Sequence, residues 1–143
     1  MGAPVVHFEI MSRDGKRAQE FYSSLFGWNI DSNNPWAYGM VKTGVKMGIN
    51  GGVGQVDSDK QPYVTLYAQV ENAQACLDRA VGMGARVVLP VTVMPNMVTY
   101  ALFSDPQGNL VGIVEGPQTL PKAKRKAAPR KKRASKARGR RKR

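Results

Sequence analysis

The feature that most constrains this chain is a strand-helix unit that occurs twice. Over Val5–Ile10 the side chains alternate, so His7 and Glu9 lie on one face of a predicted strand and Val6, Phe8 and Ile10 on the other. The next segment has the apolar spacing of an amphipathic helix, and Gly27 marks its end. That helical stripe consists of Ala18, Phe21, Tyr22, Leu25 and Phe26.

The same spacing returns 55 residues later, after an alternating strand over Tyr63–Val70 and before Gly82 and Gly84. The second stripe consists of Ala73, Cys76, Leu77, Ala80 and Val81, and the only cysteine of the chain is therefore expected to be a buried small hydrophobe. A repeated strand-helix unit predicts helices on one side of a sheet and a free opposite side. That free side should carry His7 and Glu9 with Tyr63, Thr65, Tyr67 and Gln69.

Each copy continues with three more predicted strands. In the first copy these are Trp28–Asp31, Trp36–Lys42 and Val45–Val53, and in the second Arg86–Met94, Val98–Phe103 and Leu110–Glu115. Residues Asp105–Gly108 have the composition of a type I turn, which indicates a hairpin. The glycines from Gly48 to Gly54 leave three interpretations open: close approach of a ligand or of another backbone, a bulge, or a bend.

Charge divides the 143-residue chain into two parts. Of its 22 Lys and Arg residues, 14 lie in Lys122–Arg143 with no acid, which leaves 8 basic and 10 acidic residues before them, a net charge of −2. We therefore expect one folded domain over residues 4–117 and a basic tail over residues 118–143 that is disordered in isolation, because Lys122–Arg143 has no large apolar group to bury. No segment has the length of a membrane span, and a cytoplasmic protein is expected.

The tail predicts non-specific binding to nucleic acid or another polyanion, with a nucleoid-associated location as one consequence. Its cations can neutralise phosphates, but it has no aromatic side chain for base stacking and no scaffold for reading base edges. The residues expected to make these contacts are Lys124, Arg125, Lys126, Arg130, Lys131, Lys132, Arg133, Arg138, Arg140 and Arg141.

Three segments of the first copy resemble the opening of glyoxalase/bleomycin-resistance/dioxygenase proteins, the vicinal oxygen chelate superfamily: His7–Ile10, Ala18–Tyr22 and Leu25–Trp28. The second copy agrees at Val70–Asn72, Gly84–Val87 and Phe103–Asn109. The resemblance covers Val5 to about Glu115. It implies an α+β fold in which two βαβββ modules form a curved eight-stranded sheet with helices on the outer face, often as a dimer.

The resemblance also implies a small-molecule or metal site in the concave cavity, with metal ligands from the first and last strand of each module. His7 matches the first ligand position, whereas Thr65 and Gly112 stand where a histidine and the final glutamate would be. No Asp, Glu or His occurs between Ser32 and Val56, and strand alternation points Glu115 to the wrong face. A catalytic metal needs three or four converging ligands, so no metal is expected.

The sequence therefore predicts a metal-free, glyoxalase-like protein that holds an organic ligand in the cavity. His7 and Glu9 are the candidate acid and base, and a carboxylate beside the imidazole is expected to favour its protonated form. The predicted ligand-binding residues are Trp36, Tyr38, Thr65, Tyr67, Gln69 and Gly112, with Tyr63 as a further aromatic wall. Two alternatives remain: nucleic-acid association through the tail, and a lyase or dioxygenase of this superfamily with a divalent metal at His7.

Overall fold

A computed structural model of the chain describes residues 2–116. Two helices and eight strands form two successive βαβββ modules, which confirms the predicted α+β class. The elements are β1 (Val5–Ser12), α1 (Gly15–Phe26), β2 (Asn29–Asp31), β3 (Gly39–Lys42), β4 (Gly51–Gln55), β5 (Tyr63–Val70), α2 (Ala73–Gly82), β6 (Arg86–Met94), β7 (Val98–Ser104) and β8 (Leu110–Glu115). The predicted basic tail and its ten phosphate-contacting residues lie outside the described residues.

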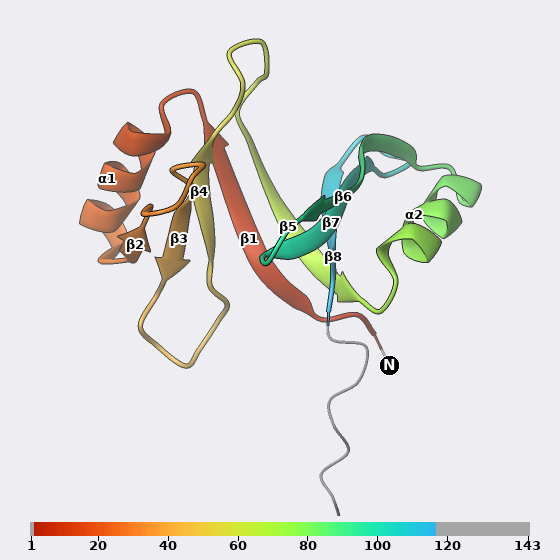
Figure 1. Cartoon of the computed structure of the whole chain (residues 1–143), viewed down its shortest axis with the longest axis horizontal. Coiled ribbons are helices and arrows are strands. Elements are labelled where there is room, and N and C mark those ends of the chain that lie inside the picture. The colour runs from red at the N-terminus through yellow and green to blue at the C-terminus, as the bar shows by residue number, and fades with distance from the viewer. Residues whose placement is uncertain (1, 117–143) are drawn as a thin grey trace, which may run out of the picture.

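All eight strands belong to one curved sheet in the order β2-β3-β4-β1-β5-β8-β7-β6. The two modules join at the centre, where β1 and β5 pair antiparallel, while β1–β4 and β5–β8 are the parallel pairs. In Figure 1, α1 and α2 lie at opposite ends of the molecule, outside the curve of the sheet. The modules are therefore related by an approximate twofold axis that runs between β1 and β5.

Local sequence signals explain where both helices begin and where α1 ends. The Asp14 and Asn72 side chains accept hydrogen bonds from the backbone N–H groups of Arg17 (3.0 Å) and Ala75 (2.8 Å), so each is an N-cap. Gly27 follows α1 with φ of 67°, and its N–H donates to the Ser23 carbonyl at 2.9 Å. This left-handed C-terminal residue confirms the predicted glycine stop.

The second module holds an aliphatic core between α2 and the sheet. Its buried members are Ala73, Leu77, Ala101 and Ile113, and Cys76, Val70, Val91 and Phe103 pack around them. Cys76 is thus partly buried beside this core, as its place on the helical stripe predicts. The Glu115 side chain accepts a hydrogen bond from the Ala73 N–H at 3.2 Å, which places it on the helical side of the sheet, away from the concave face.

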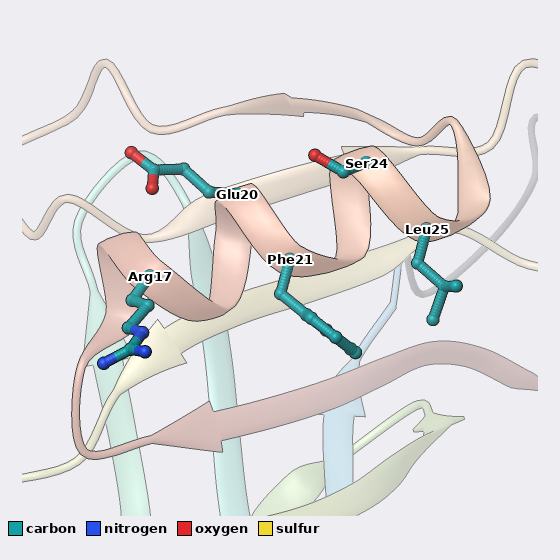
Figure 2. A pocket seen from close by; sticks show the side chains of 5 residues that line it. All are labelled: Arg17, Glu20, Phe21, Ser24 and Leu25. Atoms are coloured by element: carbon teal, nitrogen blue, oxygen red, sulfur yellow. The ribbon is translucent and has the colours of Figure 1, made fainter.

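The stripe of α1 is largely exposed, which its periodicity alone did not predict. Phe21 and Leu25 are each 57% exposed. Figure 2 shows them on one side of α1 with Arg17, beside a shallow surface hollow that Glu20 and Ser24 also line. The contacts that attach the helix to the sheet include the Gln19 amide, which donates to the Val53 carbonyl at 2.8 Å.

Two predicted strands of the first module are too long. Strand β3 begins at Gly39, because Ala37 just before it has φ of 50°, outside strand geometry. Strand β4 begins at Gly51 instead of Val45, since Gly44 and Gly48 adopt positive φ in the preceding loop. The alternation of Val45, Met47 and Ile49 was therefore misleading.

The strands of the second module follow the prediction closely. Strand β6 runs through Pro90 at the edge of the sheet, with one register shift before Leu89 and one between Leu89 and Thr92, and an edge or irregular position is where a strand tolerates proline. The predicted hairpin turn is confirmed by the Gly108 N–H, which donates to the Asp105 carbonyl at 2.9 Å.

Within residues 2–116, neither helix is long and apolar enough to cross a membrane.

Candidate functional site

The central strand pair brings the predicted polar residues to one face of the sheet. In the β1–β5 register, His7 lies opposite Tyr67 and Glu9 lies opposite Thr65. Paired residues of antiparallel strands point to the same side, so all four share the face opposite the helices. The approximate twofold axis thus exchanges His7 with Thr65 and Glu9 with Tyr67.

Glu9 is the centre of a hydrogen-bonded cluster on this face. Its Oε1 accepts from the hydroxyls of Tyr63 (3.1 Å) and Tyr67 (3.0 Å), and its Oε2 accepts from the hydroxyl of Tyr38 (2.9 Å). Glu9 is only 8% exposed, and Tyr67 only 5%. A buried carboxylate needs such partners, and three hydroxyl donors suit its acceptor-only, ionised form.

His7 joins the cluster through Tyr38. The His7 Nε2 lies 2.9 Å from the Tyr38 hydroxyl, and the imidazole ring meets the Tyr67 ring edge-on at 5.6 Å between centroids. Because Tyr38 donates its single proton to Glu9, Nε2 must carry the hydrogen that the Tyr38 oxygen accepts. The network therefore assigns the Nε2–H tautomer and leaves Nδ1 as an acceptor.

Glu9 favours the protonated form of the His7 imidazole, as predicted, but burial outweighs this effect. Burial lowers the pKa of His7 below its ordinary value of 6.5, and the opposing charge of Glu9 is the smaller effect. At neutral pH the imidazole is therefore neutral.

The tyrosines around Glu9 are held as neutral phenols. Burial, and then the negative charge of Glu9, raises the pKa of Tyr38, Tyr63, Tyr67 and Tyr100 above the ordinary value of 10.0. A hydrogen bond to Glu9 adds to this shift for the first three of them. Each hydroxyl therefore keeps its proton at physiological pH.

Two glycines create the space that the tyrosine rings occupy. Gly52 lies opposite Glu9 in the β1–β4 register, and a Cβ there would lie 1.8 Å from the Tyr38 hydroxyl. Gly112 lies opposite Tyr67 in the β5–β8 register, and a Cβ there would lie 2.4 Å from that ring. At Gly52 and Gly112, close approach of a side chain is therefore the reason for glycine.

The structure brings together some predicted site residues and not others. His7, Glu9, Tyr38 and Tyr67 form the hydrogen-bonded cluster, and Tyr63 completes it. Thr65 is 6% exposed beside Glu9, but its hydroxyl donates to the Leu110 carbonyl at 2.8 Å. Trp36 lies in the loop before β3 and is 52% exposed, and Gln69 packs against Gly116 at the end of β5.

Tyr100 is the site residue that sequence reasoning missed. Its ring centroid lies 6.3 Å from that of Tyr67. Met40 pairs with Gly52 in the first module, and Leu102 pairs with Gly112 in the second. Tyr38 lies two positions before Met40, and Tyr100 lies two positions before Leu102. Tyr100 is thus the twofold equivalent of Tyr38, and aligning the third strands of the two copies could have found it.

The residues at the expected metal-ligand positions do not fit a metal ion. Thr65 and Gly112 stand at two of them, and the twofold equivalent of Gly112 on β4 is Gly52. A divalent catalytic site needs at least three protein donors, and His7 alone supplies one here. Among residues 2–116, no group of three His, Cys, Asp or Glu side chains is placed to hold an ion.

Comparison with known proteins agrees with the fold. Residues 5–44 match the family model described as bleomycin resistance protein-like N-terminal. The candidate glyoxylase CFP32 of Mycobacterium tuberculosis, like its counterpart in Mycobacterium bovis, is 26% identical to this chain in an alignment of 114 residues, and the match covers 73% of this chain. This chain spans 42% of the length of those relatives.

Solved structures share this fold. Methylmalonyl-CoA epimerase from Mycobacterium tuberculosis aligns with a TM-score of 0.56 and 17% identity, over 80% of this chain and 89% of that one. A glyoxalase/bleomycin resistance protein/dioxygenase superfamily member from Vibrio splendidus 12B01 aligns with a TM-score of 0.54 and 17% identity, over 80% and 98%. With its paired βαβββ modules and these matches, the chain is similar to proteins of the glyoxalase/bleomycin-resistance/dioxygenase superfamily and has their fold.

Proposed function

We propose that this protein binds a small organic molecule on the concave face of its sheet and does so without a metal ion. The observation that carries the proposal is the Glu9 cluster, in which a buried carboxylate gathers Tyr38, Tyr63 and Tyr67 from both modules. A structural purpose alone does not require this arrangement, because apolar residues of similar volume fill a core at lower cost than a buried charge. A small number of convergent polar groups between aromatic side chains is typical of ligand sites.

The fold relatives support a small-molecule ligand, since one of them is named for its action on methylmalonyl-CoA. Apart from His7, the positions that carry metal ligands in metal-dependent members of the superfamily are here threonine or glycine, and tyrosine rings fill the space beside both glycines. In this proposal the tyrosines replace the metal as the polar anchor. Neutral His7, with its free Nδ1, is the group placed to accept a proton from a bound ligand.

The proposal is tested by a thermal-shift and calorimetric screen of metabolites and antibiotics against the full chain, after treatment with a chelator. We expect at least one compound to raise the melting temperature, and we expect Tyr38→Phe to weaken its binding. Tyr22→Phe is the matched control, because Tyr22 of α1 packs against Phe26 and against Trp28, which follows the helix. A screen without a ligand, or a ligand that binds only when a divalent metal is restored, contradicts the proposal.

A second function is favoured by the charge of the C-terminal segment. We propose that its 14 cations, unopposed by any acid, bind DNA, RNA or another polyanion without sequence preference. The folded part before the tail carries a net charge of −2 and gives no electrostatic reason for such binding. The two functions therefore rest on separate parts of the chain.

The tail proposal is tested with a full-length variant in which the ten residues named above become glutamine. We expect wild-type affinity for a DNA duplex to fall steeply with salt and the variant to lose most of its low-salt affinity. The control is wild-type protein with DNA duplexes of unrelated sequence, which should bind equally. Equal DNA affinity of the variant and the wild type would remove the tail from the account.

A further inference from the structure

The hydrogen atoms of the Glu9 cluster determine which ligands its surface can accept. Tyr38, Tyr63 and Tyr67 each have one hydroxyl proton, and Glu9 accepts all three. His7 gives its Nε2 hydrogen to the Tyr38 oxygen. Each phenol oxygen and His7 Nδ1 then retain lone pairs but no hydrogen. To a ligand, the cluster therefore presents hydrogen-bond acceptors and almost no hydrogen-bond donors.

Tyr100 is the exception to this inventory. Its ring packs against Tyr67, but no hydrogen bond within residues 2–116 holds its hydroxyl. One free donor among several acceptors does not change the balance. A ligand that hydrogen-bonds to this face has to bring donors of its own.

The charge at this face points in the same direction. Glu9 is ionised in this network, and the side chains that face it from the neighbouring strands are uncharged: Met40, Gly52, Gly54, Tyr63, Thr65, Tyr67, Tyr100, Leu102 and Gly112. By strand alternation, Lys42 and Arg86 share the face, but both are exposed and lie on strands two and four places from β1. Asp31 of β2 shares it as well and adds negative charge. The carboxylate thus has no nearby cationic partner from the sheet.

We propose that the concave face recognises a primary ammonium group, which donates to the acceptor oxygens of the tyrosines and neutralises the charge of Glu9. This inference rests on the proposed small-molecule function and names the class of its ligand. A primary ammonium supplies three N–H donors and one positive charge, which matches both properties of the site. The tyrosine rings add favourable contacts to a cation. Carboxylates and phosphates are disfavoured here, because they bring negative charge and acceptors only.

Four ligands of similar size separate the contributions of charge and of donors. They are 2-phenylethylamine, its N,N,N-trimethyl derivative, 2-phenylethanol and 3-phenylpropionate, titrated into the full chain at pH 7 while the tyrosine ring signals are followed by NMR. We expect the amine to bind about tenfold or more tightly than the alcohol, since hydrogen bonds to charged groups are the stronger ones. The trimethyl compound, which has charge but no N–H, should fall between them, and the carboxylate should bind weakest.

Two variants and one control assign the preference to the cluster. Glu9→Gln should bring the amine and the alcohol to similar affinity. Tyr63→Phe removes one phenol acceptor, together with one donor to Glu9, and keeps the charge, so it should weaken the amine and the alcohol, which carry N–H or O–H donors, and leave the trimethyl compound unchanged. Tyr22→Phe should leave all four affinities unchanged. If Glu9→Gln does not fold, the Tyr63→Phe comparison still decides the question.

The ammonium inference is overturned if the alcohol or the carboxylate binds as tightly as the amine, or if none of the four shifts the tyrosine signals. The proposed binding function has its own test in the broader screen. A ligand from that screen that is anionic and loses affinity in Tyr38→Phe would keep the function and remove the ammonium class.

Discussion

Leu77 of α2 is 3% exposed, whereas Leu25 of α1 is 57% exposed, although both belong to the apolar stripe of a helix in the same βαβββ plan. The second module buries its stripe in an aliphatic core. The first module attaches its helix by the Gln19 amide and by stacked rings of Tyr22, Phe26 and Trp28. One backbone plan thus accommodates two ways of holding a helix.

The concave face differs between the modules in the same way. The twofold axis relates His7 to Thr65 and Glu9 to Tyr67, so the only charge of the cluster and its only imidazole come from β1. The second module contributes two hydroxyl donors to Glu9 from β5. Neither module alone could satisfy the buried carboxylate, and the cluster therefore couples the two halves of the sheet.

The largest expected effect distinguishes the two helices. Leu77→Ala should lower the free energy of unfolding by about 2–5 kcal/mol, because it opens a cavity in the core of α2. Leu25→Ala should cost less than about 1 kcal/mol, because that side chain is already in water. Chemical denaturation of both variants at several protein concentrations measures the difference. A Leu25→Ala loss that matches the Leu77→Ala loss and grows with protein concentration would contradict the comparison and indicate the predicted dimer, with α1 covered by a second copy.

The next effect separates two equivalent tyrosines. Tyr38→Phe removes a donor to Glu9 and the acceptor of His7, and should destabilise the fold by about 1.5–3 kcal/mol. Tyr100→Phe removes a hydroxyl that is not hydrogen-bonded within the described residues, and should change stability by less than about 0.5 kcal/mol. Denaturant midpoints of the two variants decide this prediction. Equal losses would mean that the asymmetry of the cluster has no energetic consequence.

The third prediction tests whether Gly112 is needed to make room for the ring of Tyr67. Gly112→Ala places a methyl group 2.4 Å from the ring of buried Tyr67 and should cost about 1–3 kcal/mol. Gly82→Ala is the control, because nothing lies within 4 Å of a Cβ at the end of α2, and it should be neutral or slightly stabilising. Thermal unfolding of both variants measures the contrast. In a Tyr67→Ala background the cost of Gly112→Ala should largely disappear, and its persistence would exclude the clash as the cause.

Much of this fold is predictable from sequence because its signals are local. Alternation places β1 and β5, Asp14 and Asn72 begin the helices, and Gly27 ends α1 through its left-handed conformation. The glycine-rich segment before Gly51 is the exception, since alternating apolar residues there coincide with backbone angles that a strand cannot adopt. Whether the stripe of α1 is covered is likewise not a local property of its sequence.

The site is predictable only up to the face on which it lies. Strand alternation places His7 and Glu9 together, but the convergence of three hydroxyls on Glu9 depends on the register between distant strands. Tyr100 becomes visible only when the third strands of the two modules are aligned. The effect of Glu9 on His7 could be predicted from the sequence but the net pKa shift could not, because burial, which a sequence does not reveal, outweighs the neighbouring carboxylate.

The smallest expected effect concerns the pH dependence that His7 introduces and that its equivalent, Thr65, cannot. Burial among Phe8, Tyr38 and Tyr67, with Glu9 as the nearby charge, lowers the pKa of His7 in the folded chain below 6.5. As the pH falls through 6.5, the unfolded chain therefore takes up a proton that the folded chain does not, and the folded state loses stability. The loss is at most about 1.4 kcal/mol per pH unit and stops once the folded imidazole is also protonated.

Unfolding free energies of wild type and His7→Gln between pH 7.5 and pH 5 isolate this contribution, since all other titrating groups are common to both proteins. The wild type should lose more stability than the variant as the pH falls below 6.5, while above that value the difference between them should stay constant. If the unfolding free energies of wild type and His7→Gln differ by the same amount at every pH, the imidazole has the same pKa in the folded and the unfolded chain. In that case the ring is better hydrated than its contacts with Tyr38 and Tyr67 imply, and the acceptor inventory on which the ammonium inference rests would need a protonated His7 as a further donor.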